Sequence, residues 1–316
     1  MISIITPVKN VDRWIDDCYR SIQQQSYSNW EWIVVNDHSS DNTATIINQF
    51  ASSDHRVRPI ENDDKGIISA LQKALVNAKG EYITRMDADD LMPPKRLEQM
   101  FGAIQDAPAN TLITGLVKYF DQEIVSEGYQ VYEEWLNEIN LRGNQWSQVY
   151  RECVIASPNW LMRKMELDSI GGFSGLSYPE DYDLVFQLYK HNFQIEVIPE
   201  ITLYWREHPD RTSRNSPNYQ QEAFFELKVR RFIAIDYHGG PLIVWGNNVK
   251  SRLSMDLLKQ HGLVPIQQDL QNYRLIEKID SPQLLIAVYP ESTERDMITS
   301  YLKSIGMIEG IDWWWL

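Results

Sequence analysis

Three carboxylates, Asp87, Asp89 and Asp90, lie within four residues directly after the apolar run 82–86. If this run is a strand, the carboxylates stand at its carboxyl end, where open α/β sheets bind ligands. Carboxylate oxygens suit Mg²⁺ or Mn²⁺, and such a cation in turn holds the phosphates of a nucleotide. An acidic surface turn before a helix that begins near Pro93 explains the same residues equally well. The rest of the chain has to decide between these two interpretations.

The elements around this cluster alternate between strand and helix over the first hundred residues. Short apolar runs predict strands at 2–6, 30–35, 57–61 and 82–86. Amphipathic runs predict helices at 12–25, 43–51 and 67–78. Such repeated βα units are typical of a mostly parallel sheet that is flanked by helices on both faces. In this α/β fold the loops after the strands bind the ligand, and these loops are 6–10, 37–41, 63–66 and 87–90.

The later part of the chain is less regular, and its clearest boundary is the Gly-Gly-Pro run at 239–241. Further strands are expected at 157–162, 194–198, 201–205, 242–245 and 284–289, and further helices at 130–146, 182–191, 249–261 and 293–305. We therefore expect a large domain at 1–218, a linking helix at 219–238 and a small Rossmann-like α/β domain at 239–316. The turn that starts at Gly246 lacks the second and third glycines of a dinucleotide site. We expect a structural, regulatory or partner-docking role for this small domain.

The composition disfavours some partners. The chain has 44 acidic and 30 basic residues and a formal net charge of -14, which argues against binding to nucleic acid or anionic membrane through bulk charge. No apolar run approaches the length of a transmembrane helix, and no basic leader precedes the first strand. We therefore expect a cytoplasmic protein with at most peripheral membrane contact. Cys18 and Cys153 are too few for a disulfide framework or a zinc site, and Cys18 is expected to be a buried thiol.

Several segments together resemble family 2 glycosyltransferases with the GT-A fold, in the family's order and spacing over about residues 1–215. These segments are 3–10, 25–31, 35–41, 64–66, 80–83, 87–90, 171–173, 179–181 and 204–208. More loosely, 239–316 resembles small Rossmann-like appendages on some bacterial members. The resemblance implies transfer of a sugar from a nucleotide donor, usually a UDP-sugar, to a hydroxyl acceptor with inversion at the anomeric carbon. The acceptor would be a saccharide or lipid-linked saccharide of a bacterial surface polysaccharide, such as lipopolysaccharide, capsule or O-antigen.

The resemblance also implies roles for individual residues. The positions that would bind the donor nucleotide are Thr6, Pro7, Asn10, Asp37, Ser39, Lys65, Gly66, Asp87 and Arg206. The positions that would hold the cofactor, Mn²⁺ or Mg²⁺, are Asp87, Asp89 and His208, supported by Asp90 and Glu180. Asp181 would be the catalytic base. Trp160 and Tyr178 are weaker candidates for an acceptor platform, and loops at about 115–180 would select the acceptor.

The proposed chemistry explains why these residue types are needed. The leaving diphosphate gains negative charge, which a divalent cation neutralises as a Lewis acid. The acceptor hydroxyl must lose a proton as it attacks, and a carboxylate base typically contributes about 10²–10⁴-fold in rate. Asp181 at a helix start is expected to stay ionised, as a base should. The family usually has glycine where this chain has His38, and since histidine adopts positive φ less readily, the loop 37–41 is expected to differ in shape.

Each candidate also has a structural explanation. Glu180 and Asp181 could only cap a helix, and Lys65 could be a solvated charge. Trp160 and Tyr178 could be core aromatics. Among other function classes, a nucleotidyl- or phosphoryl-transferring enzyme is disfavoured because the sequence has no Walker-type loop. A catalytically silent sugar-nucleotide-binding or scaffold protein, docking partners through 239–316, is the remaining alternative.

Overall fold

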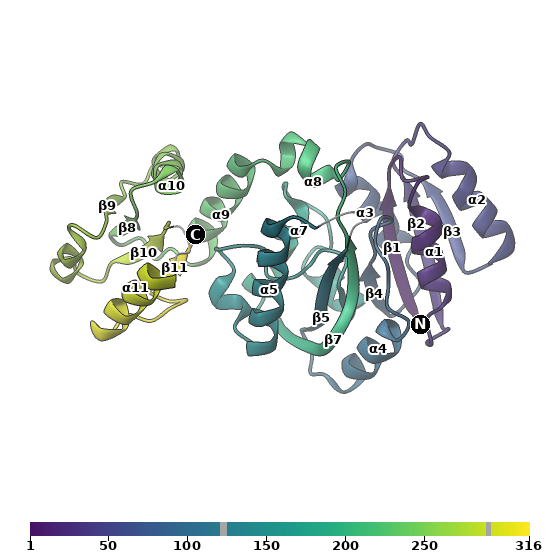
Figure 1. Ribbon diagram of the computed structural model, residues 1–316, viewed down its shortest axis with the longest axis horizontal. Helices are drawn as coiled ribbons and strands as arrows, with labels where there is room; N and C mark the ends of the chain where they lie inside the picture. Colours follow the sequence, from purple (N-terminus) through teal and green to yellow (C-terminus); the bar gives the residue numbers. More distant parts are fainter. Residues whose placement is uncertain (121–124, 289–291) are drawn as a thin grey trace. The chain divides into compact units, whose positions relative to one another are not determined.

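A computed structural model describes residues 1–120, 125–288 and 292–316 of the chain (Figure 1). The chain forms two compact units, and each is described by itself. Unit 1 comprises residues 1–143, 154–176 and 180–211, and unit 2 comprises residues 144–153, 177–179 and 212–316. The predicted domains 1–218, 219–238 and 239–316 are continuous ranges, whereas unit 2 also includes two short earlier segments, 144–153 and 177–179. The division into these three domains stays a prediction.

Unit 1 is built on a seven-stranded sheet with the order β3-β2-β1-β4-β6-β5-β7. Its strands are β1 (Ile2–Val8), β2 (Trp30–Asn36), β3 (Val57–Glu61), β4 (Tyr82–Arg85), β5 (Thr111–Phe120), β6 (Trp160–Arg163) and β7 (Gln194–Arg206). Only β6 among these strands runs antiparallel to its neighbours, β4 and β5. The predicted mostly parallel α/β sheet is therefore confirmed.

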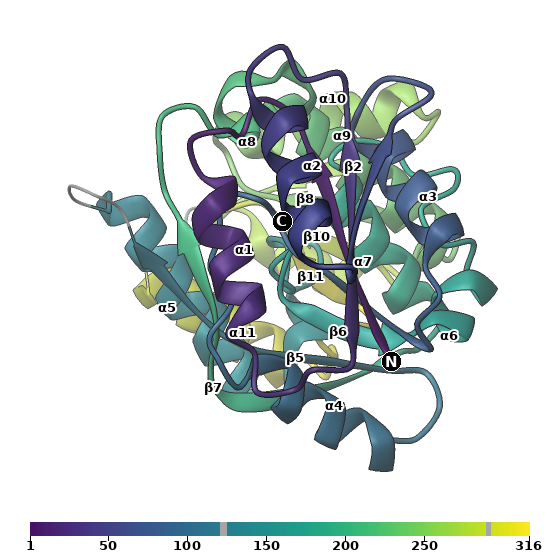
Figure 2. The same ribbon diagram turned by 90° about the vertical axis from the view of Figure 1, so that its right-hand side faces the viewer.

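Helices flank both faces of this sheet, with α1 and α2 on one face and α3 on the other (Figures 1 and 2). The helices of unit 1 are α1 (Ile15–Gln23), α2 (Thr43–Ser53), α3 (Ile67–Asn77), α4 (Arg96–Asp106), α5 (Glu127–Arg142), α6 (Lys164–Ser169) and α7 (Glu180–Lys190). The amphipathic pattern of α1 explains its place, since Ile15, Cys18, Tyr19 and Ile22 are all buried. Cys18 is thus the buried thiol that the sequence predicted.

The last strand of unit 1 corrects one prediction. The two strands expected at 194–198 and 201–205 are a single strand, β7, which pairs in parallel with β5. Gly115 of β5 pairs with Ile198 and the next residue, Leu116, pairs with Ile201. Pro199 and Glu200 therefore have no partner residue in β5. An edge strand tolerates a proline that lacks an N–H, because one side of it has no partner strand. Strand β5 itself was not predicted.

Unit 2 contains a four-stranded parallel sheet with the order β11-β10-β8-β9. Its elements are α8 (Thr212–Asn215), α9 (Gln221–Ile235), β8 (Leu242–Trp245), α10 (Val249–Gln260), β9 (Ile266–Gln268), β10 (Gln283–Ile286), α11 (Ser292–Ser304) and β11 (Trp313–Trp315), with 3₁₀ turns η1 (Gln145–Gln148), η2 (Pro217–Tyr219) and η3 (Tyr273–Lys278). The predicted strand 284–289 ended at Tyr289, which lies outside the described residues.

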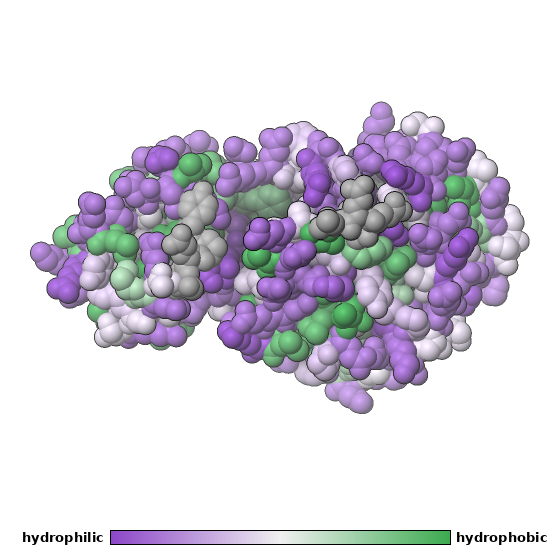
Figure 3. Space-filling model, in the orientation of Figure 1, coloured by the Kyte–Doolittle hydropathy of each residue, from purple (hydrophilic) through white to green (hydrophobic). Residues whose placement is uncertain are grey.

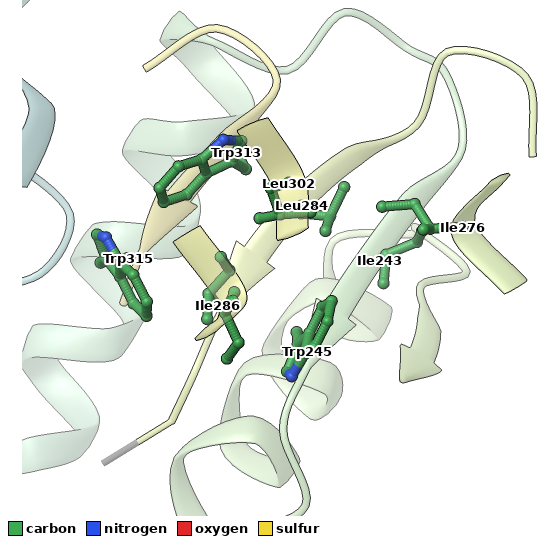
Figure 4. Close-up of a cluster of buried hydrophobic side chains, with 9 residues drawn as sticks. Ile243, Trp245, Ile276, Leu284, Ile286, Leu302, Trp313 and Trp315 are labelled. Atoms are coloured by element: carbon green, nitrogen blue, oxygen red, sulfur yellow. The ribbon is translucent and has the colours of Figure 1, made fainter. Parts of the chain in front are cut away.

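A buried hydrophobic cluster of unit 2 lies on one face of its sheet, where side chains of β8, β10 and β11 pack together (Figure 4). Trp313 and Trp315 point into this cluster, and both are less than 7% exposed. The aromatic tail of the chain is therefore core of its own unit, because burying indole surface from water stabilises the sheet that it joins.

The surface seen in Figure 3 is mainly hydrophilic, and its apolar residues lie in small separate groups. Within the described residues, no helix combines the length and the apolar character needed to cross a bilayer.

Candidate active site

The loops after β1, β2 and β3 are joined by hydrogen bonds. The backbone N–H of Asn10 donates to Ser39 Oγ at 3.0 Å, and Asn10 Oδ1 accepts from the Ser40 N–H at 2.8 Å. Asp37, which follows β2, accepts from the Gly66 N–H at 3.0 and 3.1 Å and from Asn62 Nδ2 at 2.9 Å. Three of the four loops that were predicted to bind the ligand are thus held together by hydrogen bonds.

Asp37 is buried and remains an anion. Burial raises its pKa, but hydrogen bonds from Asn62 and Gly66 and the charge of Lys9 lower the pKa below its ordinary value. The carboxylate therefore shapes the 63–66 turn as well as being a candidate nucleobase contact. Lys65 in that turn is exposed.

His38 adopts the backbone conformation that glycine would allow. Its φ is +56°, in the left-handed region. Its Nε2 lies 2.9 Å from the carbonyl oxygen of Asp64, in the turn that Asp37 also holds. His38 therefore has the left-handed backbone conformation that glycine would allow, and its ring adds the contact with Asp64.

Strand β1 ends at Val8, beyond the predicted strand 2–6, so Pro7 and Val8 also lie in the strand and not in the loop expected at 6–10. The carbonyl oxygen of Ile5 accepts from the N–H of Met86, the residue after β4. Alternate residues of a strand face the same neighbouring strand, so the backbone of Pro7 also faces the β4 side, where β4 has already ended. The missing N–H of Pro7 therefore costs no ladder bond. Thr6 is fully buried and its Oγ1 accepts from Trp32 Nε1 at 2.8 Å, so its side chain is not available to a ligand.

Asp89 of the acidic turn pairs with His208. His208 Nε2 lies 3.0 Å from Asp89 Oδ2, although the two residues are 119 positions apart. Burial raises the pKa of Asp89, but the hydrogen bond from His208 and the charge of Arg211 lower it below its ordinary value. The other ring nitrogen of His208, Nδ1, is buried without a hydrogen-bond partner.

An aromatic side chain of the segment before α1 holds this corner of the site. The ring of Trp14 lies 5.2 Å from that of His208 in a tilted arrangement, and the guanidinium carbon of Arg206 lies 4.6 Å from the Trp14 ring. Arg206 also donates to the carbonyl oxygen of Asp89 at 2.6 Å. Aromatic and cation–π contacts of this kind help to orient both polar groups.

The donor set fits a cation that is shared with phosphates. Mg²⁺ is usually bound by one or two carboxylates plus substrate phosphates, and Asp89 supplies such a carboxylate with the imidazole of His208 beside it. The predicted set of three is not assembled, because both oxygens of Asp87 accept from Arg85, at 2.7 and 3.2 Å. Among the residues that the structure describes, no three histidine, cysteine, aspartate or glutamate side chains are placed to hold a metal ion.

Asp90 joins the acidic turn to the end of β7, and its predicted supporting role stays a prediction. It is 1% exposed, and its Oδ1 accepts from the backbone N–H of Arg206 at 2.7 Å. Burial and the charges of Asp89 and Asp87 raise its pKa well above the ordinary range. Through its Oδ1, Asp90 ties the end of β7 to the acidic turn, whereas its Oδ2 is buried without a hydrogen-bond partner.

Glu180 and Asp181 open α7 but have different surroundings. Glu180 is 1% exposed, and its Oε1 accepts from Arg85 Nη1 at 3.2 Å. Asp181 is half-buried, and its Oδ1 accepts from the N–H of Tyr182 at 2.8 Å. Burial and the charge of Glu180 raise the pKa of Asp181 to about 7. The favourable effect of the helix dipole therefore does not keep Asp181 fully ionised, because burial and the charge of Glu180 have a larger opposite effect on its pKa.

A cavity in unit 1 lies beside this pair, and its lining includes Asp181, Arg85, Trp160 and Phe173. Trp160 is 3% exposed, so it is a core residue whose side chain also borders the cavity. Tyr178 is half-buried in unit 2, where its ring lies 5.9 Å from that of Tyr219. The joint acceptor role of Trp160 and Tyr178 stays a prediction.

Sequence reasoning missed Arg85 and Trp14. Arg85 is the last residue of β4, two positions before the first carboxylate, and a cation in an otherwise apolar strand is the signal that could have revealed it. Trp14 gave no comparable signal, since an aromatic residue near the start of an amphipathic helix is usually core.

The fold and sequence were compared with those of known proteins. The family model described as "Glycosyl transferase family 2" matches residues 3–171. Glycosyltransferase GlyG of Streptococcus pneumoniae is 29% identical over 175 residues, which are 53% of this chain and 58% of GlyG. This chain thus spans less than two thirds of that relative. The O-antigen biosynthesis glycosyltransferase WbnJ of Escherichia coli is 25% identical over 75% of this chain and 94% of WbnJ.

A solved structure has the same fold. The crystal structure of S. aureus TarS 1–349 in complex with UDP-GlcNAc superposes with a TM-score of 0.58 at 16% identity, over 82% of this chain and 72% of that one. At this identity the likeness supports the GT-A fold alone. The family match covers more than half of the 316 residues. The chain therefore belongs to glycosyl transferase family 2.

Proposed function

We propose that this protein is an inverting glycosyltransferase that moves a sugar from a nucleotide-sugar donor to a hydroxyl group of an acceptor. The observation that carries the proposal is Asp181, a half-buried carboxylate beside a cavity, whose pKa burial and Glu180 raise to about 7. A general base works best when its pKa lies near the working pH. Membership of the family supports the same reaction class.

In the proposed reaction the acceptor oxygen attacks the anomeric carbon on the side opposite to the diphosphate. The bond from the anomeric carbon to the diphosphate oxygen breaks, its electron pair leaves with the nucleoside diphosphate, and the configuration inverts. Asp181 takes the proton of the acceptor hydroxyl. Glu180 is already paired with Arg85, which favours Asp181 over Glu180 as the base.

We assign the nucleotide to the loops that follow β1, β2 and β4. Asp37 would accept from a ring N–H of the base, since its carboxylate is kept ionised. Asp87, oriented by Arg85, would accept from a ribose hydroxyl. A uracil nucleotide is the donor class we favour, and the likeness to a protein crystallised with UDP-GlcNAc supports testing it first.

Asp89 and His208 would hold a divalent cation, and Arg206 lies beside them to offset negative charge. When bound, such a cation stabilises the charge that develops on the leaving diphosphate. The proposed acceptor is a saccharide or lipid-linked saccharide, in line with the O-antigen role of WbnJ. A lipid-linked acceptor would place the protein peripherally at the inner face of the membrane.

A thermal-shift screen tests the donor site without knowledge of the acceptor. A ligand that binds only the native state raises the melting temperature by mass action. We expect stabilisation by UDP or one UDP-sugar with Mn²⁺ or Mg²⁺, and loss of that effect in EDTA. Hydrolysis of the stabilising UDP-sugar should then disappear in Asp181→Asn while UDP binding is kept. UDP binding without turnover in the unaltered protein would instead support a silent sugar-nucleotide-binding protein.

A further inference from the structure

Arg85 connects two parts of the candidate site that are far apart in the sequence. Its Nε and Nη2 donate to the two oxygens of Asp87, and its Nη1 donates to Glu180 Oε1. Arg85 is 5% exposed, and its guanidinium borders the same cavity as Asp181. One side chain thus holds a carboxylate of the turn after β4 and a carboxylate at the start of α7 at the same time.

The backbone from which this side chain projects is itself held firmly. Arg96 of α4 is fully buried and donates to the carbonyl oxygen of Arg85 at 3.3 Å. The same Arg96 nitrogen donates to Thr84 Oγ1 at 3.0 Å and to the carbonyl oxygen of Pro158 at 2.6 Å. The end of β4 therefore cannot shift without breaking several buried hydrogen bonds, and buried polar groups that lose their partners are costly.

Charge gives the second argument. Asp87, Glu180 and Asp181 are three carboxylates around one guanidinium, and like charges in a buried site repel one another. The fork of an arginine side chain can satisfy two carboxylates in fixed directions, which a lysine ammonium cannot do. Since Glu180 directly precedes Asp181 in α7, the ion pair of Glu180 also fixes the helix turn that carries Asp181.

We propose that Arg85 is a positioning residue that couples the donor side of the site to the base, by holding Asp87 and Glu180 together and leaving Asp181 beside the cavity. This inference rests on the proposed glycosyl transfer and deepens it. Arg85 acts on the reaction through its two carboxylate partners, and it makes Glu180 a structural partner of the guanidinium.

The test compares Arg85→Lys with the control Arg163→Lys in the full chain. Arg163 lies on β6 of the same sheet, pairs with Glu166 and donates to three backbone carbonyls, so its replacement also removes a partly buried guanidinium network. The measurements are the UDP dissociation constant and the turnover number for hydrolysis of the UDP-sugar that stabilises the protein. We expect Arg85→Lys to lower turnover by about 10²-fold, the effect of a small misplacement of reacting groups.

We expect the UDP dissociation constant of Arg85→Lys to rise by less than about tenfold, since a contact to one carboxylate is loosened and the other nucleotide contacts remain. Turnover at saturating donor equal to that of Arg163→Lys would overturn the inference, whatever the UDP affinity. In that case Arg85 would serve Asp87 alone, or only the fold.

A second measurement decides the matter even if no UDP-sugar is turned over. The charged groups that act on Asp181 are Glu180 on its own helix, and Arg85 and Asp87 from β4 and its turn. Carbon-13 NMR of labelled aspartate carboxyls, with Asp181 assigned through Asp181→Asn, follows its titration directly. In Arg85→Met the titration midpoint of Asp181 should move upward, and an unmoved midpoint would overturn the coupling. Absence of turnover in the unaltered protein would refute only the proposed function.

Discussion

The acid limb of the pH–rate profile should have its midpoint at about pH 7. Burial and the charge of Glu180 raise the pKa of Asp181 to about 7, and only the ionised carboxylate can accept the acceptor's proton. The ionised fraction is then about one tenth at about pH 6 and about nine tenths at about pH 8, so kcat/KM should rise about tenfold between them. An ordinary aspartate, with a pKa of about 3.9, would give no rise in this range.

The assay is release of the nucleoside diphosphate from the identified nucleotide-sugar, measured at constant ionic strength across this pH range. The quantity to follow is kcat/KM, because its profile reports the free enzyme, which is the state described by the structure. Asp181→Asn should abolish turnover at every pH. The midpoint should also stay constant with temperature, since a carboxyl group ionises with little enthalpy.

A flat profile between about pH 6 and about pH 8 would refute the reasoning, because it would show that the base is already ionised throughout. The error would then lie in the balance of forces at Asp181: Arg85 and the Tyr182 N–H, which lower its pKa, would outweigh burial and Glu180.

Three further predictions concern stability and ligand binding. Because the folded-state pKa of Asp181 is raised, a bound proton stabilises the native protein below about pH 7, and this stabilisation is lost as the pH rises. Asp181→Asn should therefore raise the melting temperature at about pH 8 relative to the unaltered protein, and an unchanged melting temperature contradicts the raised pKa. Asp89→Asn should abolish the Mn²⁺-dependent part of nucleotide stabilisation in a thermal-shift assay while the ligand-free melting temperature stays close to the original; stabilisation that still disappears in EDTA would sink the metal assignment. Two substitutions at buried sites should lower the free energy of unfolding measured in urea. Ile33→Ala, at 0% exposure in β2, should lower it by about 2–5 kcal/mol, and Gly115→Ala by about 1–3 kcal/mol because its new Cβ would lie 2.3 Å from Thr202 Oγ1.

Much of the fold followed from local patterns. The apolar strands and amphipathic helices of the first hundred residues predicted a parallel sheet, and β3 (Val57–Glu61) was predicted to the residue. The predicted fold failed where tertiary pairing overrides local signals. Two strands were expected at 194–198 and 201–205, but one edge strand runs through Pro199 with an irregular register against β5.

The candidate site divides in the same way. Asp37 and Asp89 were predicted as candidates because they follow predicted strands, and Asp181 because residues 179–181 resemble a motif of the family. Partners that come from distant segments carry no such local signature. The pairing of Glu180 with Arg85 joins residues 95 positions apart, and neither residue type alone predicts it.

The sequence by itself determined the fold class, the family and the positions of the acidic residues, since hydrophobic period and motif spacing are local properties of the chain. Only the tertiary structure decided which partner meets each of those acids. Arg85 orients Asp87 and the Arg206 N–H bonds one oxygen of Asp90, whereas Asp89 meets His208 and Asp181 borders a cavity. Burial and neighbouring charge set the protonation of a carboxyl group, and both depend on residues that only folding brings together.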